Sequence, residues 1–149
     1  MIDQALAAYA HFLAIFATLG CLMAEAALYR PRMSEASFGR LQWLDRLYGI
    51  GAVAIIITGL LRVFFFAKGP EFYAVNPVFW VKMALFLAVG LLSIPPTVHY
   101  IRSKRQLQGG ELVIETATYR RMRGYITLQL ALFALIPLAA TFMARGIGM

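Results

Sequence analysis

The sequence predicts an all-α membrane protein, a four-transmembrane-helix bundle that forms one domain over residues 1–149. Of the 149 residues, 61% are hydrophobic and only 14% are charged. That leaves too little polar surface to cover a water-soluble domain of this length. Four apolar segments are each long enough to cross the hydrocarbon core of a bilayer, which takes about 20 helical residues. The net charge of +7 is concentrated between these segments, as the positive-inside rule describes.

The four membrane spans follow from the apolar segments in chain order. They are expected near residues 5–29, 47–66, 79–100 and 125–143. The first segment lacks the basic start of a signal peptide and carries Asp3 and Glu25. It is also longer than the apolar core of a signal peptide, so we expect a genuine span.

Two features modify the regular pattern of spans. Pro95-Pro96 in the third span predicts freed backbone carbonyls and a kink near its end. Between the third and fourth spans, the stretch from Glu111 to Arg123 is predicted to form a short interfacial helix. Its apolar side would consist of Leu112, Ile114 and Met122.

Ten of the fourteen Lys and Arg residues occupy two stretches between apolar segments. They are Arg30, Arg32, Arg40 and Arg46 in the first, and Arg102, Lys104, Arg105, Arg120, Arg121 and Arg123 in the second. This clustering predicts that both stretches face the cytoplasm, with the N- and C-termini outside, in a bacterial inner membrane. Membrane topology thus explains the basic charge. The expected surroundings are the lipid bilayer, with no nucleic acid as partner.

Five ionisable residues lie within or at the edge of the spans. They are His11, Glu25, Arg62, Lys82 and His99. Such groups are costly in hydrocarbon and usually face a bundle interior, pair with one another or line a ligand site. At about 1.5 Å per helical residue, His11, Arg62 and Lys82 are expected to share the outer leaflet. Glu25 and His99 fall near the inner side, together with Tyr48.

Helical periodicity arranges polar residues as stripes on the first two spans. Positions seven residues apart stay close to one face of a helix. The first stripe consists of His11, Thr18 and Glu25, and the second of Tyr48, Gly51, Thr58 and Arg62. We predict that the two stripes face each other across the bundle interior.

The outer group suggests a cofactor site. Neutral imidazole is a good ligand for haem iron, and two cations suit the carboxylates of a tetrapyrrole. His11 is therefore the expected metal ligand, and Arg62 and Lys82 the expected cofactor-binding residues. His99 is a further cofactor-binding candidate, although its depth differs from that of His11 by well over 10 Å, at about 1.5 Å per residue. Snorkelling to the interface is the alternative for Arg62 and Lys82.

The inner group has two interpretations. Glu25 either forms a structural ion pair with an arginine of the basic stretches or serves as a proton-relay residue. His99 is either a ligand or an interfacial hydrogen-bonding residue. A catalytic zinc site would need three clustered ligands, and the sequence does not offer them.

Several local motifs resemble those of the small haem b-containing membrane protoporphyrinogen oxidases of bacteria, the HemJ type. The motifs are His11 followed by Leu28-Tyr29-Arg30-Pro31-Arg32, then Arg46-Leu47-Tyr48-Gly49 and Thr58-Gly59-Leu60, then Trp80, Lys82 and His99 in that order. The resemblance covers about 100 residues over the first three spans. The chain departs from that family in lacking a tryptophan after the first-span histidine and in its longer Lys82-to-His99 spacing. It also resembles an uncharacterised family of four-span bacterial membrane proteins distantly related to these oxidases.

The resemblance implies a function and roles for individual residues. It implies a haem- or porphyrin-binding membrane redox protein that oxidises protoporphyrinogen, with haem b as cofactor and a tetrapyrrole or another hydrophobic small molecule as partner. His11 would bind the haem, and Lys82 and Glu25 are the catalytic candidates. The alternative is a small non-enzymatic membrane protein, a transporter or a partner subunit, with a polar bundle interior. A homo-oligomer is compatible with both.

Overall fold

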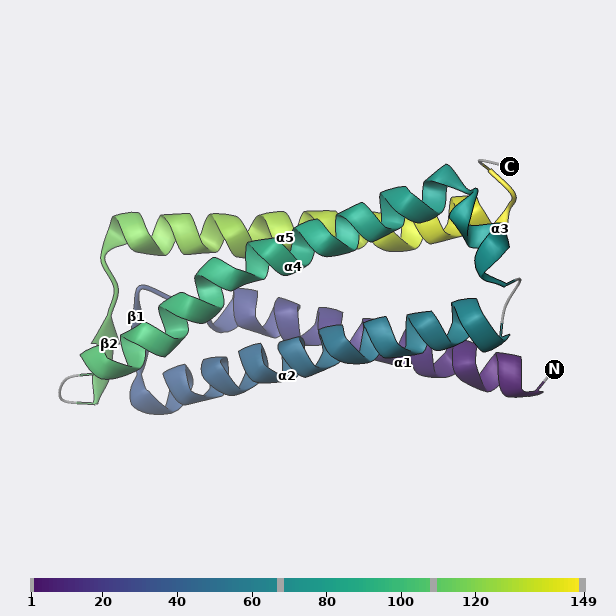
Figure 1. The fold of residues 1–149 in the computed structure, drawn as a ribbon. Helices are drawn as coiled ribbons and strands as arrows, with labels where there is room; N and C mark the ends of the chain where they lie inside the picture. The colour runs from purple at the N-terminus through teal and green to yellow at the C-terminus, as the bar shows by residue number, and fades with distance from the viewer. Residues whose placement is uncertain (1, 67–68, 108–109, 148–149) are drawn as a thin grey trace.

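The computed structural model describes residues 2–66, 69–107 and 110–147 and has four long helices in this part of the chain (Figure 1). They are α1 (Ile2–Leu28), α2 (Glu35–Leu61), α4 (Pro77–Ser103) and α5 (Thr116–Ala144). Each is long and apolar enough to cross a membrane. The predicted all-α fold with four membrane-spanning helices is confirmed.

Short elements connect the long helices. A π-helical turn over Arg62–Phe66 continues α2, and α3 (Pro70–Ala74) follows it. A 3-10 turn over Lys104–Gln106 ends α4. Strands β1 (Arg32–Ser34) and β2 (Glu111–Val113) pair at one end of the bundle. We call this end the ribbon end and the opposite end, which carries both termini and α3, the terminal end (Figure 1).

The two strands correct the prediction for the link between the third and fourth spans. Glu111–Val113 is not helical but pairs antiparallel with β1, with Leu112 opposite Met33. Both side chains are buried, as is Ile114. Apolar residues two apart, such as Leu112 and Ile114, share one face of a strand but not of a helix. The predicted helix is therefore wrong for Glu111–Val113. Residues 116–123 are helical as predicted, but they form the start of α5, which begins at Thr116.

The helices extend beyond the apolar segments at the ribbon end. Helix α2 begins at Glu35 instead of near residue 47, and α5 begins at Thr116 instead of near residue 125. With 29 residues, α5 is roughly 43 Å long at about 1.5 Å per residue. A bilayer core is about 30 Å thick. Many basic residues of the two stretches therefore lie on helix ends instead of in loops.

The helices form two pairs. Helix α1 packs along α2, and α4 packs along α5, whereas α2 and α4 have few contacts with each other (Figure 1). The largest buried side chains lie towards the ribbon end and come from all the long helices. Examples are Leu22, Tyr29, Phe38, Leu41, Tyr100 and Ile126. The looser contact between the two pairs leaves room for a groove between α2 and α4.

The two consecutive prolines do not end α4, which continues through Pro95 and Pro96 to Ser103. Because a proline has no backbone N–H, Pro96 leaves the carbonyl of Leu92 without its usual helical donor. The side-chain amide of Gln129 on α5 donates to this carbonyl at 3.1 Å. The predicted freed carbonyl thus becomes a contact between α4 and α5.

Candidate functional site

The polar stripes of the first two spans meet along the α1–α2 contact. Nδ1 of His11 lies 2.9 Å from Oγ1 of Thr58. A Cβ atom built on Gly51 would overlap Oγ1 of Thr18, and one on Gly59 would lie 3.3 Å from Cε1 of His11. Gly51 allows this close approach, since a side chain there would collide with Thr18, whereas a Cβ atom at Gly59 would make only a tight contact with His11. The prediction that the stripes face each other is confirmed, and the space between them is filled.

The contact with Thr58 fixes the proton position on His11. The Thr58 hydroxyl has one hydrogen, which it donates to the carbonyl of Ala54 at 2.6 Å. It therefore accepts from His11, so Nδ1 of the neutral ring carries the proton. Nε2 is left with a free lone pair. A ring nitrogen held in this way is how proteins orient histidines that bind metals.

A cavity of about 260 Å³ at the terminal end contains two of the predicted site residues, His11 and Lys82. The Lys82 ammonium lies 5.3 Å from the centre of the Phe79 ring. Arg62 does not line this cavity. Its guanidinium lies over the ring of Phe12, 5.7 Å from the ring centre. His11 interacts electrostatically with Arg62 and with Lys82. The three residues therefore lie at a similar level along the bundle, although Arg62 does not line the cavity.

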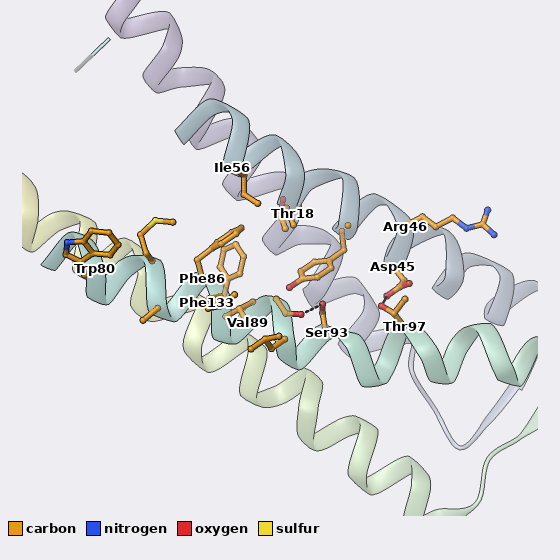
Figure 2. Close-up of a pocket in the computed structure, with 18 residues that line it drawn as sticks. Thr18, Asp45, Arg46, Ile56, Trp80, Phe86, Val89, Ser93, Thr97 and Phe133 are labelled. Atoms are coloured by element: carbon orange, nitrogen blue, oxygen red, sulfur yellow. Dashed lines mark hydrogen bonds between the residues drawn. The ribbon is translucent and has the colours of Figure 1, made fainter. Parts of the chain in front are cut away.

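A second cavity, of about 860 Å³, extends towards the ribbon end between α2 and α4 (Figure 2). Most of its lining is apolar, and its polar residues include Asp45 and Thr97 at the far end. The Thr97 hydroxyl donates to the Asp45 carboxylate at 2.7 Å.

The two cavities form one groove, because they share part of their lining. The shared residues are Ile56, Trp80, Met83, Phe86 and Phe133. Small-molecule sites usually occupy about 300–1,000 Å³. The groove has Lys82 at one end, which we call the basic end, and Asp45 with the outward-extending Arg46 at the other, which we call the acidic end. The lining between the two ends is mostly apolar.

Glu25 lies behind the acidic end of the groove and is only 3% exposed. Its Oε1 atom has no hydrogen-bond partner in the described part of the chain. The predicted ion pair with an arginine of the basic stretches is not formed there. Instead, Arg123 donates to the backbone carbonyl of Ala26, the residue after Glu25.

Asp45 is a site residue that the sequence reasoning missed. It interacts electrostatically with Glu25 and Tyr48 and reaches α4 through Thr97. Asp45 lies just before the predicted start of the second span at residue 47, so it was not among the ionisable residues considered within the spans. Its spacing from Tyr48, three residues on one helix face, was the signal that pointed inward.

His99 lies near the ribbon end of α4, and both ring nitrogens have partners. Burial and the neighbouring Tyr119 raise the pKa of the Tyr29 phenol above its usual value. The Tyr29 hydroxyl is hydrogen-bonded to Nε2 of His99 at 3.1 Å, and Nδ1 lies 3.4 Å from the Ser103 hydroxyl. The structure does not bring His99 to the cavity that His11 lines.

No group of three or more His, Cys, Asp or Glu side chains in the described residues is arranged to hold a metal ion. The histidines are also separated: His11 lines the cavity at the terminal end, whereas His99 lines neither of the two cavities.

The family assignment comes from a profile of the DUF2214 family, described as predicted membrane proteins. It matches residues 3–148, so the chain belongs to this family. Comparison with the curated proteins and with the solved structures gives no match.

Proposed function

We propose that this member of the DUF2214 family binds a hydrophobic small molecule that carries carboxylates, in the groove between α2 and α4. The class we favour is a tetrapyrrole. The observation that carries the proposal is the shared cavity of His11 and Lys82. It offers an oriented imidazole and a cation at the same end of an apolar groove. An apolar pocket with a few convergent polar groups is the usual form of a small-molecule site.

The residues of the terminal end fit haem b as the bound group. Thr58 orients His11 and leaves Nε2 with a lone pair, which is the form of histidine that binds haem iron. Lys82 would bind a propionate through a charge-assisted hydrogen bond. When bound, haem would supply one-electron redox chemistry. His99 is left out of the proposed ligand set, because its nitrogens already have partners.

The apolar middle of the groove supports a flat hydrophobic ligand. Phe86 and Phe133 line both cavities and lie opposite Ile56 of α2 (Figure 2). A tetrapyrrole ring occupying this stretch would be shielded from water on its apolar faces. Its carboxylates would lie at the basic terminal end, since Asp45 at the other end repels them.

The finer proposal, oxidation of protoporphyrinogen, rests on the resemblance to the HemJ-type oxidases. In that reaction Lys82 would bind a carboxylate of the substrate, and Glu25 would exchange protons with the groove. Appearance of porphyrin fluorescence from protoporphyrinogen, faster in membranes holding the protein than in control membranes, would support it. Rates equal to the control would exclude it and leave the binding proposal intact.

An absorption spectrum of the purified protein supplied with haem tests the binding proposal. We expect a Soret band that is lost in His11→Ala and kept in His99→Ala, which removes the chain's other histidine. A colourless protein after haem addition would exclude haem binding. A full Soret band in His11→Ala would exclude His11 as the ligand.

We also propose that the ribbon end faces the cytoplasm of a bacterial inner membrane. Both basic stretches flank the ribbon, and positive charge near spans favours the cytoplasmic side. Cysteines placed at Ala36 and at Ile147, both exposed, test the orientation with a membrane-impermeant thiol reagent in intact cells that carry Cys21→Ser. We expect labelling at Ile147 and none at Ala36, and the reverse pattern would invert the topology.

The alternative, a transporter or partner subunit, has a weaker basis. A path between the two polar stripes is blocked where Thr18 meets Gly51. In this alternative, a partner helix would occupy the groove between α2 and α4. If the protein binds no tetrapyrrole but crosslinks through cysteines at Ile56 and Leu87 to another chain, this alternative replaces the proposal.

A further inference from the structure

The acidic end of the bundle contains two buried polar atoms without partners. Glu25 on α1 is 3% exposed and Tyr100 on α4 is 1% exposed. Neither Oε1 of Glu25 nor the Tyr100 hydroxyl has a hydrogen-bond partner in the described residues. Buried polar atoms are nearly always partnered in folded proteins, so each exception needs a physical explanation. Here the two unpartnered groups, the Glu25 carboxyl and the Tyr100 hydroxyl, interact electrostatically with each other.

A second carboxyl group lies at the level of the first, because the antiparallel contact that sets His11 opposite Thr58 and Thr18 opposite Gly51 continues to Glu25 and Asp45. Asp45 on α2 interacts electrostatically with Glu25 and with Tyr100. The Thr97 hydroxyl donates to Asp45, which satisfies one oxygen but brings no positive charge. Two carboxylates in a low-dielectric interior disfavour each other's ionisation. The pair therefore holds more negative charge than its surroundings stabilise.

The neighbouring cations do not neutralise the pair. Groups that face Glu25 come from its own helix and from the three helices around it. They are Cys21, Asp45, Tyr48, Tyr100 and Arg123. The one cation in this set, Arg123, is bound to the backbone carbonyl of Ala26. Arg46 interacts electrostatically with Asp45, but its side chain extends away from that carboxylate (Figure 2).

We propose that Glu25 and Asp45 form a carboxyl pair that holds one exchangeable proton at the acidic end of the groove. Tyr48 connects the pair with the groove, since it lines the larger cavity and interacts electrostatically with both carboxyl groups. A proton needs a single acceptor oxygen. A metal ion would need more ligands than two carboxylates provide, and no group of three or more His, Cys, Asp or Glu in the described chain is placed to hold one. The proposal is independent of the ligand proposed for the basic end.

Labelling with a hydrophobic carbodiimide tests the pair, because this reagent attacks protonated carboxylic acids in apolar surroundings. The full-length protein in detergent is treated at pH 7, and adducts are located by mass spectrometry. We expect an adduct on Glu25 that is absent in Glu25→Gln and kept in Glu35→Gln, which alters an exposed glutamate at the start of α2. In Asp45→Asn, loss of the second carboxylate lowers the labelling rate about tenfold on the alkaline side of its pH profile.

Infrared difference spectroscopy gives a readout that does not depend on reagent access. We expect a carbonyl band of a protonated carboxylic acid at pH 7 that shifts in D2O and disappears in Glu25→Gln. The proposal is overturned if no such band is lost in that variant. It is also overturned if millimolar sodium protects Glu25 from the carbodiimide, because the pair then holds an alkali cation instead. Neither result would change the expected Soret band, so the two proposals fail separately.

Discussion

The two ends of the groove are built from the same helices but differ in charge and in how their polar groups are satisfied. At the terminal end, His11 is hydrogen-bonded to Thr58, and Lys82 lies over an aromatic ring. At the ribbon end, Asp45 lies near Glu25, whose buried oxygen has no hydrogen-bond partner among the described residues. We propose that the basic end receives a carboxylate and that the acidic end holds a proton.

The two ends also differ in whether their charged groups line the cavity or are buried away from it. The basic groups contact the cavity directly, so a ligand can complete their interactions. Glu25 is 3% exposed and lines neither cavity, so a ligand in the groove would not contact it directly. A buried charge is retained only when something neutralises it. The two ends therefore differ in the occupant we propose for them, and four substitutions test the groove and the helix packing that forms it.

The largest effect is expected from reversing the charge at the basic end. Lys82→Glu places a carboxylate where the ligand's own carboxylate should lie, and we expect about 100-fold weaker binding of protoporphyrin IX. Quenching of porphyrin fluorescence measures the affinity. Lys104→Glu makes the same charge change at an exposed residue of the ribbon end and should alter the affinity by about twofold at most. Equal losses in both variants would mean that only net charge matters.

The next largest effect is expected on stability, from a change at the contact between Thr18 on α1 and Gly51 on α2. Gly51→Ala forces a methyl group against Thr18, and we expect a loss of about 1–3 kcal/mol of stability from overpacking. Thermal unfolding in detergent, followed by circular dichroism, measures it. Gly49→Ala on the same helix is the control, because a Cβ atom there meets nothing within 4 Å. Similar stability of the two variants would contradict the close approach of α1 and α2.

A smaller effect is expected from the residue that orients His11. Thr58→Val keeps the shape of the side chain but removes the acceptor for Nδ1. Loss of such a supporting hydrogen bond weakens metal-ligand affinity by about tenfold or more, and titration of the protein with haem measures this. Thr141→Val removes a hydroxyl that bonds only to Pro137 of its own helix, so it should leave haem affinity unchanged. Unchanged affinity in Thr58→Val would remove the argument for a fixed tautomer.

The smallest effect is expected from removing the contact between Gln129 on α5 and the Leu92 carbonyl on α4. Gln129→Leu leaves the Leu92 carbonyl without a donor but also removes a buried amide oxygen that has no partner in the described chain. These changes oppose each other, so we expect a loss of only about 1 kcal/mol of stability. Chemical denaturation in detergent measures it. A loss several times larger would show that α4 depends on Gln129 to continue through Pro95-Pro96.

Much of the architecture follows from the sequence because its causes are local. The length of each apolar segment identifies a span, and the seven-residue spacing of His11, Thr18 and Glu25 places them on one helix face. Facing glycines and threonines on the second span then predict the partner surface. The strand at Glu111–Val113 was missed because a three-residue strand gains its stability from pairing with β1, which local periodicity does not reveal.

The sequence alone identifies a four-span membrane protein, basic residues that gather between spans and a polar stripe on each of the first two spans. These features depend on hydrophobicity and helical period, which are properties of neighbouring residues. Three-dimensional packing sets which helices separate to form the groove, places Arg62 outside the cavity and brings Asp45 to the level of Glu25. These depend on how each helix rotates and packs against the other three, because side chains from different helices share one interior.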